Sequence, residues 1–511
     1  MILLSNGVQR KVGIILQYAQ MIISISIQLI YTPIMLRILG QTEYGIYNVA
    51  SSVISYLSLF SLGFGSSYLR FYTMYKNKND SERLGSLNGL YLSVFFVIGG
   101  IAFVAGLFLV FNVEWFYNET YSTKDIEIAR TLMVFLTVNL SVSFPSSVFV
   151  SYITSQEKFI FQKIVNIGKT IIGPVVNLIL LYSGYGSIGM VVTTTCISLL
   201  IDVINIWFCF SKIGMKISFK NMDFHLLKKI FVFSIFIGIN GIIDQINWQT
   251  DKILLGKIVN GTAVAVYAVG SQINMLFTQF STSISSVYAP KVNRIVQGNT
   301  ETMDNELTSL FIKIGRIQWF VLSLILSGFI FFGRFFVLKW AGDGYERSYY
   351  VALLLMSPAL IPLIQNIGIE IQRAKNKHQF RSIVYLVMAI LNVVISIFLI
   401  LCFGEIGAAL GTTISLVVAN GIIMNIYYHK KLGINILEFW KSIISTIPGL
   451  VIPVAGGVCL MLFYTFNSVL DFCLLILVYV VVYAVSIFFL GFNKEEKRSV
   501  CSLVKKVFKI I

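Results

Sequence analysis

The chain has 511 residues, of which 57% are hydrophobic and 12% are charged, whereas a soluble domain has about 45–50% apolar and about 25% charged residues. This composition predicts a polytopic integral membrane protein and excludes an ordinary soluble domain. The formal net charge of +16 would suit a nucleic-acid partner. The basic residues fall in short loops between apolar runs, however, so no nucleic-acid partner is expected.

Fourteen apolar runs are long enough to cross a hydrocarbon core of about 30 Å, which predicts an all-α fold of about fourteen transmembrane helices. In chain order they lie at about 12–36, 44–69, 86–111, 127–153, 164–183, 188–210, 230–255, 263–289, 314–337, 349–372, 382–402, 406–428, 442–464 and 471–491. The first run is too long for a cleavable signal peptide and lacks a small-residue cleavage pattern, so we expect it to remain as a span.

The basic residues assign a side to each loop. If the N-terminus is cytoplasmic, 30 of the 39 Lys and Arg residues lie on the inner side and 8 on the outer side, and Lys169 lies inside a span. Short cytoplasmic loops carry such an excess of basic residues, which also attract anionic lipids. We therefore expect a multi-pass protein with both termini in the cytoplasm.

The sequence repeats itself at a shift of 218–220 residues, which is typical of transporters built from two halves. Residues 47–51 (YNVAS), for example, correspond to residues 267–271 (YAVGS). Six spans separate equivalent helices, so both copies have the same orientation. The expected parts are an N-terminal six-helix lobe at 1–211, a C-terminal six-helix lobe at 212–429, and two appended helices with a basic cytoplasmic tail at 430–511.

The seventh run carries two aspartates, Asp244 and Asp251, where a lipid-buried helix should carry none. On an ideal helix they share one face with Asn240 and Asn247. A carboxylate that faces hydrocarbon costs roughly 2.5 kcal/mol or more, so this face should lie against other helices or a water-filled cavity. Hydrogen bonding between helices and a solvated path for substrate or ions both account for it.

The first run has a comparable polar face, formed by Gln17, Gln20, Ser24, Gln28 and Tyr31. The repeat aligns three of these positions, 20, 24 and 31, with Asn240, Asp244 and Asp251. Helix packing through small residues explains these matched faces less well than it explains serines alone. The second run adds a polar face of its own, formed by Asn48, Ser51, Ser55 and Ser58.

Cysteine and histidine do not indicate a metal or cofactor site. The six cysteines contain no C-x-x-C pair and fall mostly inside apolar runs, which argues against a disulfide framework and against a metal site. The three histidines lie in basic loops. No polar stretch is long enough for a nucleotide-binding or other catalytic domain, so we expect neither a cofactor nor enzymatic activity.

Two related motifs carry a family resemblance. Residues 31–47, YTPIMLRILGQTEYGIY, place a proline before Leu39-Gly40 and a Tyr-Gly pair after it, and residues 251–256, DKILLG, followed by Val266-Tyr267, echo this pattern in the second half. With these motifs the whole chain resembles the multidrug, oligosaccharidyl-lipid and polysaccharide exporter superfamily, and most closely its bacterial polysaccharide-unit flippases. The motifs are specific to the superfamily but not to a substrate.

The resemblance implies two lobes that open alternately to either side of a bacterial plasma membrane and pass an undecaprenyl-pyrophosphate-linked oligosaccharide to the outer leaflet. It implies cations that meet the pyrophosphate, for which Arg37, Lys252 and Lys169 are the candidates. Asp244 and Asp251 are candidates for coupling to H⁺ or Na⁺. Further expected partners are membrane lipids and a polysaccharide polymerase. The candidate groups for the glycan are the amides and hydroxyls of Gln20, Gln28, Tyr31, Asn240 and Asn247.

Three alternative functions stay open at the level of sequence. A cation-coupled multidrug exporter has the same fold, and a strongly acidic and aromatic cavity would favour it. A peptidoglycan-precursor flippase also has this fold, and the two appended helices permit it. An integral-membrane glycosyltransferase or polymerase is disfavoured by the internal repeat and by the lack of a long outer loop.

Overall fold

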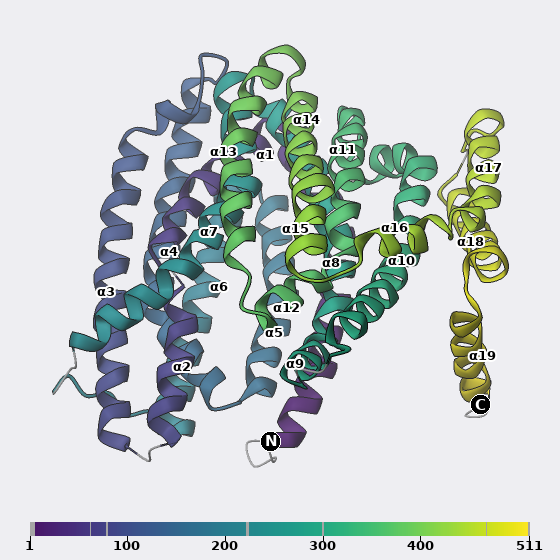
Figure 1. Cartoon of the computed structure of the whole chain (residues 1–511). Coiled ribbons are helices and arrows are strands. Elements are labelled where there is room, and N and C mark those ends of the chain that lie inside the picture. The colour runs from purple at the N-terminus through teal and green to yellow at the C-terminus, as the bar shows by residue number, and fades with distance from the viewer. Residues whose placement is uncertain are drawn as a thin grey trace. The chain divides into compact units, whose positions relative to one another are not determined.

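The computed structural model describes residues 6–61, 63–77, 80–220, 224–298, 301–466 and 468–508. Within these ranges the chain forms helices joined by short turns, with no β-strand (Figure 1). Ten of the described helices are long and apolar enough to cross a membrane, or eleven with the bent pair α16 (Ile436–Ile444) and α17 (Pro448–Phe463) taken as one span. The chain is a multi-pass membrane protein, as predicted, whereas the number of fourteen spans stays a prediction.

The first predicted span and the start of the second, at 44–69, lie in one long helical element, α1 (Asn6–Ser55), which contains two segments that meet at Gly40. The rest of the second predicted span extends through η1 (Tyr56–Ser61) to the start of α2 (Phe64–Asn77). Gly40 has φ 73° and ψ 173°, a conformation that essentially only glycine adopts, so the helix breaks there. The seventh and eighth predicted spans correspond to α7 (Phe224–Ile258) and α8 (Gly261–Ser286), which are not among the ten apolar helices.

The chain divides into two compact units: unit 1 is Met1–Ala268 with Val393–Ala408, and unit 2 is Val269–Asn392 with Ala409–Ile511. Besides α1 and α7, unit 1 contains η1 (Tyr56–Ser61), α2 (Phe64–Asn77), α3 (Ser81–Phe111), η2 (Val113–Phe116), α4 (Thr123–Ser155), α5 (Phe159–Tyr182), α6 (Gly186–Phe208) and η3 (Cys209–Ile213). The division into two repeat lobes with an appended part stays a prediction from the sequence.

Three helices contribute residues to both units: α8, α13 (Gln379–Phe403) and α14 (Glu405–Leu416). Besides α16 and α17, unit 2 contains α9 (Ala289–Gly298), α10 (Met303–Ala341), α11 (Glu346–Ile364), α12 (Ile367–Ala374), η4 (Val417–Met424), α15 (Asn425–Lys431), α18 (Val469–Ser486), η5 (Ile487–Gly491) and α19 (Lys494–Phe508).

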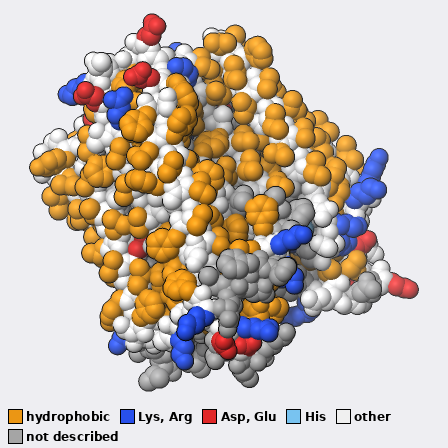
Figure 2. All heavy atoms as spheres, turned by 90° about the vertical axis from the view of Figure 1, so that its left-hand side faces the viewer, with side chains coloured by type: hydrophobic (Ala, Val, Ile, Leu, Met, Phe, Trp, Pro, Cys, Tyr) orange, Lys and Arg blue, Asp and Glu red, His pale blue; other side chains and the backbone are white. Residues whose placement is uncertain are grey.

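Apolar side chains cover the outside of the helices in unit 1. There α3 packs along α4, α1 packs along α5, and α6 packs against both α4 and α5. The outward side of α3 carries Val97, Val104 and Phe111, which are 62%, 68% and 78% exposed. On the face shown in Figure 2, hydrophobic side chains predominate and charged side chains lie mostly toward the edges. Such a continuous apolar surface is rare on soluble proteins and suits a lipid environment.

The turns of unit 1 meet in two groups, at opposite ends of α3. Near the N-terminus of α3, Asn88 Nδ2 donates a hydrogen bond to Lys216 O at 2.8 Å. Beyond its C-terminus, Lys257 Nζ donates to Tyr117 O at 2.9 Å. The first group contains turns that the charge pattern assigns to the cytoplasm, and the second contains turns that it assigns to the outside.

A buried arginine connects the C-terminal helices to α10 within unit 2. Arg316 is 4% exposed, and its Nε and Nη2 donate to the carboxylate of Glu496 on α19 at 2.6 and 2.7 Å. Its Nη1 donates to Ser442 O of α16 at 2.5 Å, and Nη2 also donates to Gly491 O at 3.0 Å. Because a bidentate arginine–carboxylate pair fixes the orientation of both partners, α16 and α19 are positioned against α10.

Candidate functional site

The ten residues predicted to contact the substrate or a coupling ion all lie in unit 1. The residues of the predicted polar face of α7 differ in their exposure to solvent. Asn240 and Asp244 are exposed and Asn247 is half-buried, whereas Asp251 is only 2% exposed. Tyr267 of α8 donates a 2.6 Å hydrogen bond to Asp251 Oδ2. Asp251 therefore links two helices, while Asn240 and Asp244 lie at the surface.

The polar face of the first segment of α1 is partly exposed along its length. Gln28 Nε2 donates a 3.1 Å hydrogen bond to Ser24 Oγ, one helical turn away. Gln20 and Tyr31 are half-buried, and Tyr31 lies beside Asn177 of α5. This segment thus presents amide and hydroxyl groups that can donate and accept hydrogen bonds.

The three candidate cations lie in different surroundings. Arg37 is exposed near the end of the first segment of α1, and Lys252 is half-buried on α7 beside Asp251. Lys169 is exposed on α5, and its Nζ donates to Ser198 Oγ of α6 at 3.3 Å. Lys169 is thus directed toward α6, whereas Lys252 has a carboxylate as its neighbour.

Asp202 on α6 is a further intramembrane carboxylate, which the polar-face pattern did not reveal. It lies one helical turn beyond Ser198, beside Ser146 of α4 and near Lys169 of α5. Ionisable side chains within transmembrane segments are expensive and usually functional. The presence of an aspartate within the apolar run at 188–210 is the sequence signal that could have identified it.

A second polar face of α7 contacts the second segment of α1 and η1. Ser52 Oγ donates to Gln249 Oε1 at 2.9 Å, and Ser55 Oγ donates to Gln245 Oε1 at 3.0 Å. Gln245 Nε2 in turn donates to Ser58 Oγ at 3.1 Å. For Ser55 and Ser58, hydrogen bonding between helices is therefore the role that the structure shows. Sequence periodicity did not identify the glutamines because they lie on the opposite side of α7 from the aspartates.

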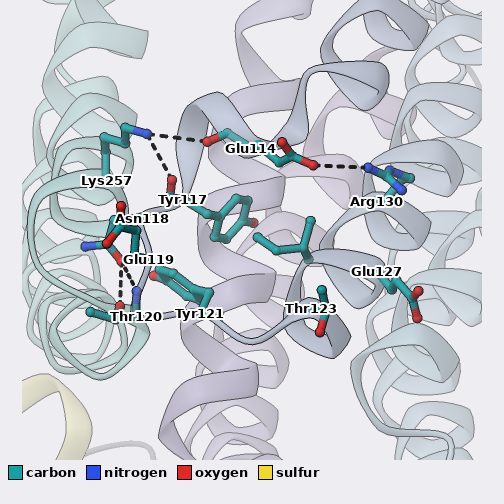
Figure 3. A pocket seen from close by; sticks show the side chains of 11 residues that line it. Glu114, Tyr117, Asn118, Glu119, Thr120, Tyr121, Thr123, Glu127, Arg130 and Lys257 are labelled. Carbon is teal, nitrogen blue, oxygen red and sulfur yellow. Dashed lines mark hydrogen bonds and ion pairs between the residues drawn. The ribbon is translucent and has the colours of Figure 1, made fainter.

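A pocket of about 760 Å³ lies between η2, the turn that follows it, the start of α4 and the end of α7 (Figure 3). Lys257 Nζ donates to the backbone oxygens of Tyr117 and Glu114, at 2.9 and 3.4 Å. Arg130 of α4 approaches Glu114 Oε1 at 3.8 Å. The pocket lies at the end of unit 1 whose turns the charge pattern assigns to the outer side of the membrane.

These sites can recognise a ligand through hydrogen bonds and charge. In the part of the chain that the structure describes, no group of three or more His, Cys, Asp or Glu side chains could hold a metal ion. The available chemistry is that of amides, hydroxyls, ammonium and guanidinium groups and separate carboxylates. These groups can bind a polar, charged or hydroxylated ligand.

The fold is shared with a solved membrane transporter. The structure of the Lipid II flippase MurJ in an inward closed conformation matches 93% of this chain and 97% of its own chain, with a TM-score of 0.70 and 16% sequence identity. The chain belongs to the family described as polysaccharide biosynthesis protein, which matches residues 10–296. The resemblance carried by residues 31–47 is therefore confirmed.

Two curated relatives are similar over most of the chain. The uncharacterized membrane protein EpsK of Bacillus subtilis (strain 168) is 22% identical over 514 residues, which cover 95% of this chain and 96% of the relative. The putative O-antigen transporter of Shigella flexneri is 20% identical over 75% of this chain and 88% of the relative.

Proposed function

We propose that this chain moves undecaprenyl-pyrophosphate-linked oligosaccharide repeat units from the cytoplasmic to the outer leaflet of a bacterial plasma membrane. The observation that carries the proposal is membership of a polysaccharide biosynthesis family over residues 10–296 in a chain with the fold of MurJ. Similarity to a putative O-antigen transporter supports a polysaccharide substrate. A Lipid II flippase and an O-antigen transporter both move a substrate without converting it chemically. The proposed function is therefore not enzymatic.

The polar groups of unit 1 suit the two polar parts of such a substrate. A pyrophosphate that leaves water must be met by cations, and Arg37, Lys169 and Lys252 supply them. Sugar hydroxyls need groups that donate and accept hydrogen bonds. The amides of Gln20 and Gln28 on α1, with those of Asn240 and Asn247 on α7, supply such groups.

The cation role can be tested by replacing Arg37 or Lys252 with Gln. Loss of one charge-assisted hydrogen bond costs about 1.5–3 kcal/mol, so glycan export should fall by roughly tenfold or more. Lys430→Gln, in the exposed last turn of α15, is the matched control and should leave export unchanged. The measurement is complementation of a strain that lacks its own flippase, with membrane abundance quantified in parallel. Normal insertion with full export by both variants would show that neither cation meets the substrate.

Ion coupling is a separate part of the proposal and is assigned to Asp244. This aspartate is exposed on α7, where it can exchange a proton or Na⁺. Asp244→Asn keeps the side-chain volume but removes the titratable charge, so membrane abundance should stay near normal while glycan export falls. Full export by Asp244→Asn would contradict the coupling role and would leave a passive flippase that is driven by consumption of the product.

A peptidoglycan-precursor flippase is the second candidate function, because the MurJ structure covers 93% of the chain. Rescue of cells depleted of their Lipid II flippase would favour this candidate over polysaccharide-unit transport. A cation-coupled multidrug exporter is the third candidate, and increased drug resistance of cells that express the chain would favour it. We expect neither rescue nor resistance.

A further inference from the structure

The pocket beside η2 is separate from the residues to which transport roles have been assigned. Its volume of about 760 Å³ falls within the roughly 300–1,000 Å³ that is typical of sites for small molecules. Figure 3 shows that side chains of η2, of the turn 117–121, of α4 and of α7 surround it. The positive-inside rule assigns this end of unit 1 to the outer side of the membrane.

The turn that forms the pocket is held in place from several sides. Tyr117 OH donates to Ile46 O of α1 at 3.2 Å, and Asn118 Nδ2 donates to Val259 O at 2.8 Å. Lys257 Nζ donates to Tyr117 O at 2.9 Å. A site whose walls are fixed before binding loses less conformational entropy when its ligand binds. The pocket is therefore preorganised.

The lining combines acceptors with aromatic rings. Glu114, Glu119 and Glu127 supply carboxylate oxygens, which accept hydrogen bonds from hydroxyl or amino groups. The rings of Tyr117 and Tyr121 pack edge to face, with centroids 4.9 Å apart. An aromatic ring offers an apolar surface next to its polar group. A sugar ring, with an apolar face and a rim of hydroxyls, matches this combination.

Tyr121 gives a second and independent indication of a ligand. Its side chain lines the pocket and is 8% exposed, and its hydroxyl makes no hydrogen bond to any residue that the structure describes. Burial raises the pKa of Tyr121 above its usual range, so this hydroxyl is a neutral donor at physiological pH. A buried hydroxyl without a partner costs free energy, and a ligand oxygen in the pocket would supply that partner.

The charges of the lining argue against an anionic ligand. Three glutamates lie around the pocket with two cations, Arg130 and Lys257. Arg130 is close to Glu114, at 3.8 Å, and Lys257 is directed to backbone oxygens. With one more carboxylate than cations, such a lining favours neutral or amino-bearing groups over a phosphate.

We propose that this pocket binds the carbohydrate part of the substrate, a neutral or amino-bearing oligosaccharide, on the outer side of the membrane, an inference that rests on the proposed function. Binding there would hold the glycan after translocation while its lipid stays in the outer leaflet. The step that follows must be one that consumes a lipid-linked glycan outside the cell, such as transfer of the repeat unit to a growing chain.

The test uses the purified full-length chain in lipid nanodiscs. The probe is the lipid-free repeat-unit oligosaccharide, cut from the surface polysaccharide of the cells that encode this chain, and binding is followed by titration calorimetry. Tyr121→Phe should weaken binding about three- to tenfold without lowering Tm, because the deleted hydroxyl makes no bond within the described protein. Glu119→Gln should also weaken binding. Absence of saturable binding by the unaltered chain, or unchanged affinity of Tyr121→Phe, would overturn the proposal.

Two tyrosines provide matched controls. Tyr117→Phe loses the hydrogen bond to Ile46 O and should lower Tm, whereas Tyr185→Phe, at an exposed position, should change neither Tm nor affinity. The export assay separates this proposal from the proposed function. Full glycan export without binding of the probe would contradict the proposed oligosaccharide site and leave the proposed flippase function standing. Binding of the probe by a chain that fails to export glycan would contradict the flippase function and leave the oligosaccharide site standing.

Discussion

At the scale of single residues, the two aspartates of α7 have different surroundings and should respond differently to substitution. Asp251 accepts the hydroxyl hydrogen of Tyr267 and is 2% exposed. Asp251→Leu removes this acceptor and should cost about 1–3 kcal/mol of stability, whereas Asp251→Asn keeps an acceptor oxygen and should be tolerated. Thermal unfolding of the purified protein in detergent measures both effects.

The control for this prediction is Asp244→Leu, because Asp244 is exposed on the same helix. It should lower Tm less than Asp251→Leu does. Tyr267→Phe removes the same hydrogen bond from the donor side and should lower Tm in the same direction as Asp251→Leu. An unchanged Tm for Asp251→Leu would show that this hydrogen bond does not stabilise the pairing of α7 with α8.

The sequence predicted individual polar residues better than their partners. Helical periodicity placed Asp244 and Asp251 on one face of α7, but it could not show that α8 covers only Asp251. It also did not reveal Gln245 and Gln249, whose roles depend on serines that lie 190 and 197 residues away along the chain. Residue type and spacing are local properties, whereas burial and hydrogen-bond partners depend on which helices become neighbours.

At the scale of helices, the second segment of α1 depends on a close glycine contact with α8. A Cβ added at Gly45 would overlap the backbone carbonyl of Gly261, and backbone cannot rotate away as a flexible side chain can. Gly45→Ala should therefore separate these helices and cost about 1–3 kcal/mol, measured as a lower Tm. The matched control is Gly100→Ala in α3, where nothing lies within 4 Å of the added Cβ. A loss of Tm no greater than that of Gly100→Ala would contradict the prediction.

The positions of most helices could be predicted from hydropathy, because a lipid-crossing segment must hydrogen-bond its own backbone. The continuity of α1 could not be predicted. The break predicted between residues 36 and 44 is reduced to one residue, Gly40, with helix on both sides. The 3₁₀-helical segment η1 after Ser55 was also not predicted, since hydropathy does not distinguish helix types. These details depend on backbone conformation at single positions.

At the scale of the whole molecule, the family and the membrane class could be predicted from the sequence, whereas the arrangement of the repeats could not be derived from hydropathy. Lipid tails are as apolar as leucine, so an apolar helix face does not indicate whether it contacts lipid or another helix. The pocket beside η2 was likewise not predicted. Its glutamates and tyrosines are spread over a turn and two helices, and only the fold brings Lys257 to them.

The side of the membrane on which each turn lies is a prediction for the whole chain, and it rests on the excess of basic residues in alternate loops. Single cysteines at Ser183 and Asp343, in a chain whose six native cysteines have been replaced, should react with an impermeant maleimide in intact cells. Cysteines at Lys220 and Lys430 should react only after the membrane is opened. All four side chains are exposed. Ser183 and Lys220 lie in unit 1, while Asp343 and Lys430 lie in unit 2, so each unit contributes one site of each kind. Reaction of both sites of a unit under the same condition would show that this unit does not have the expected alternation of its spans.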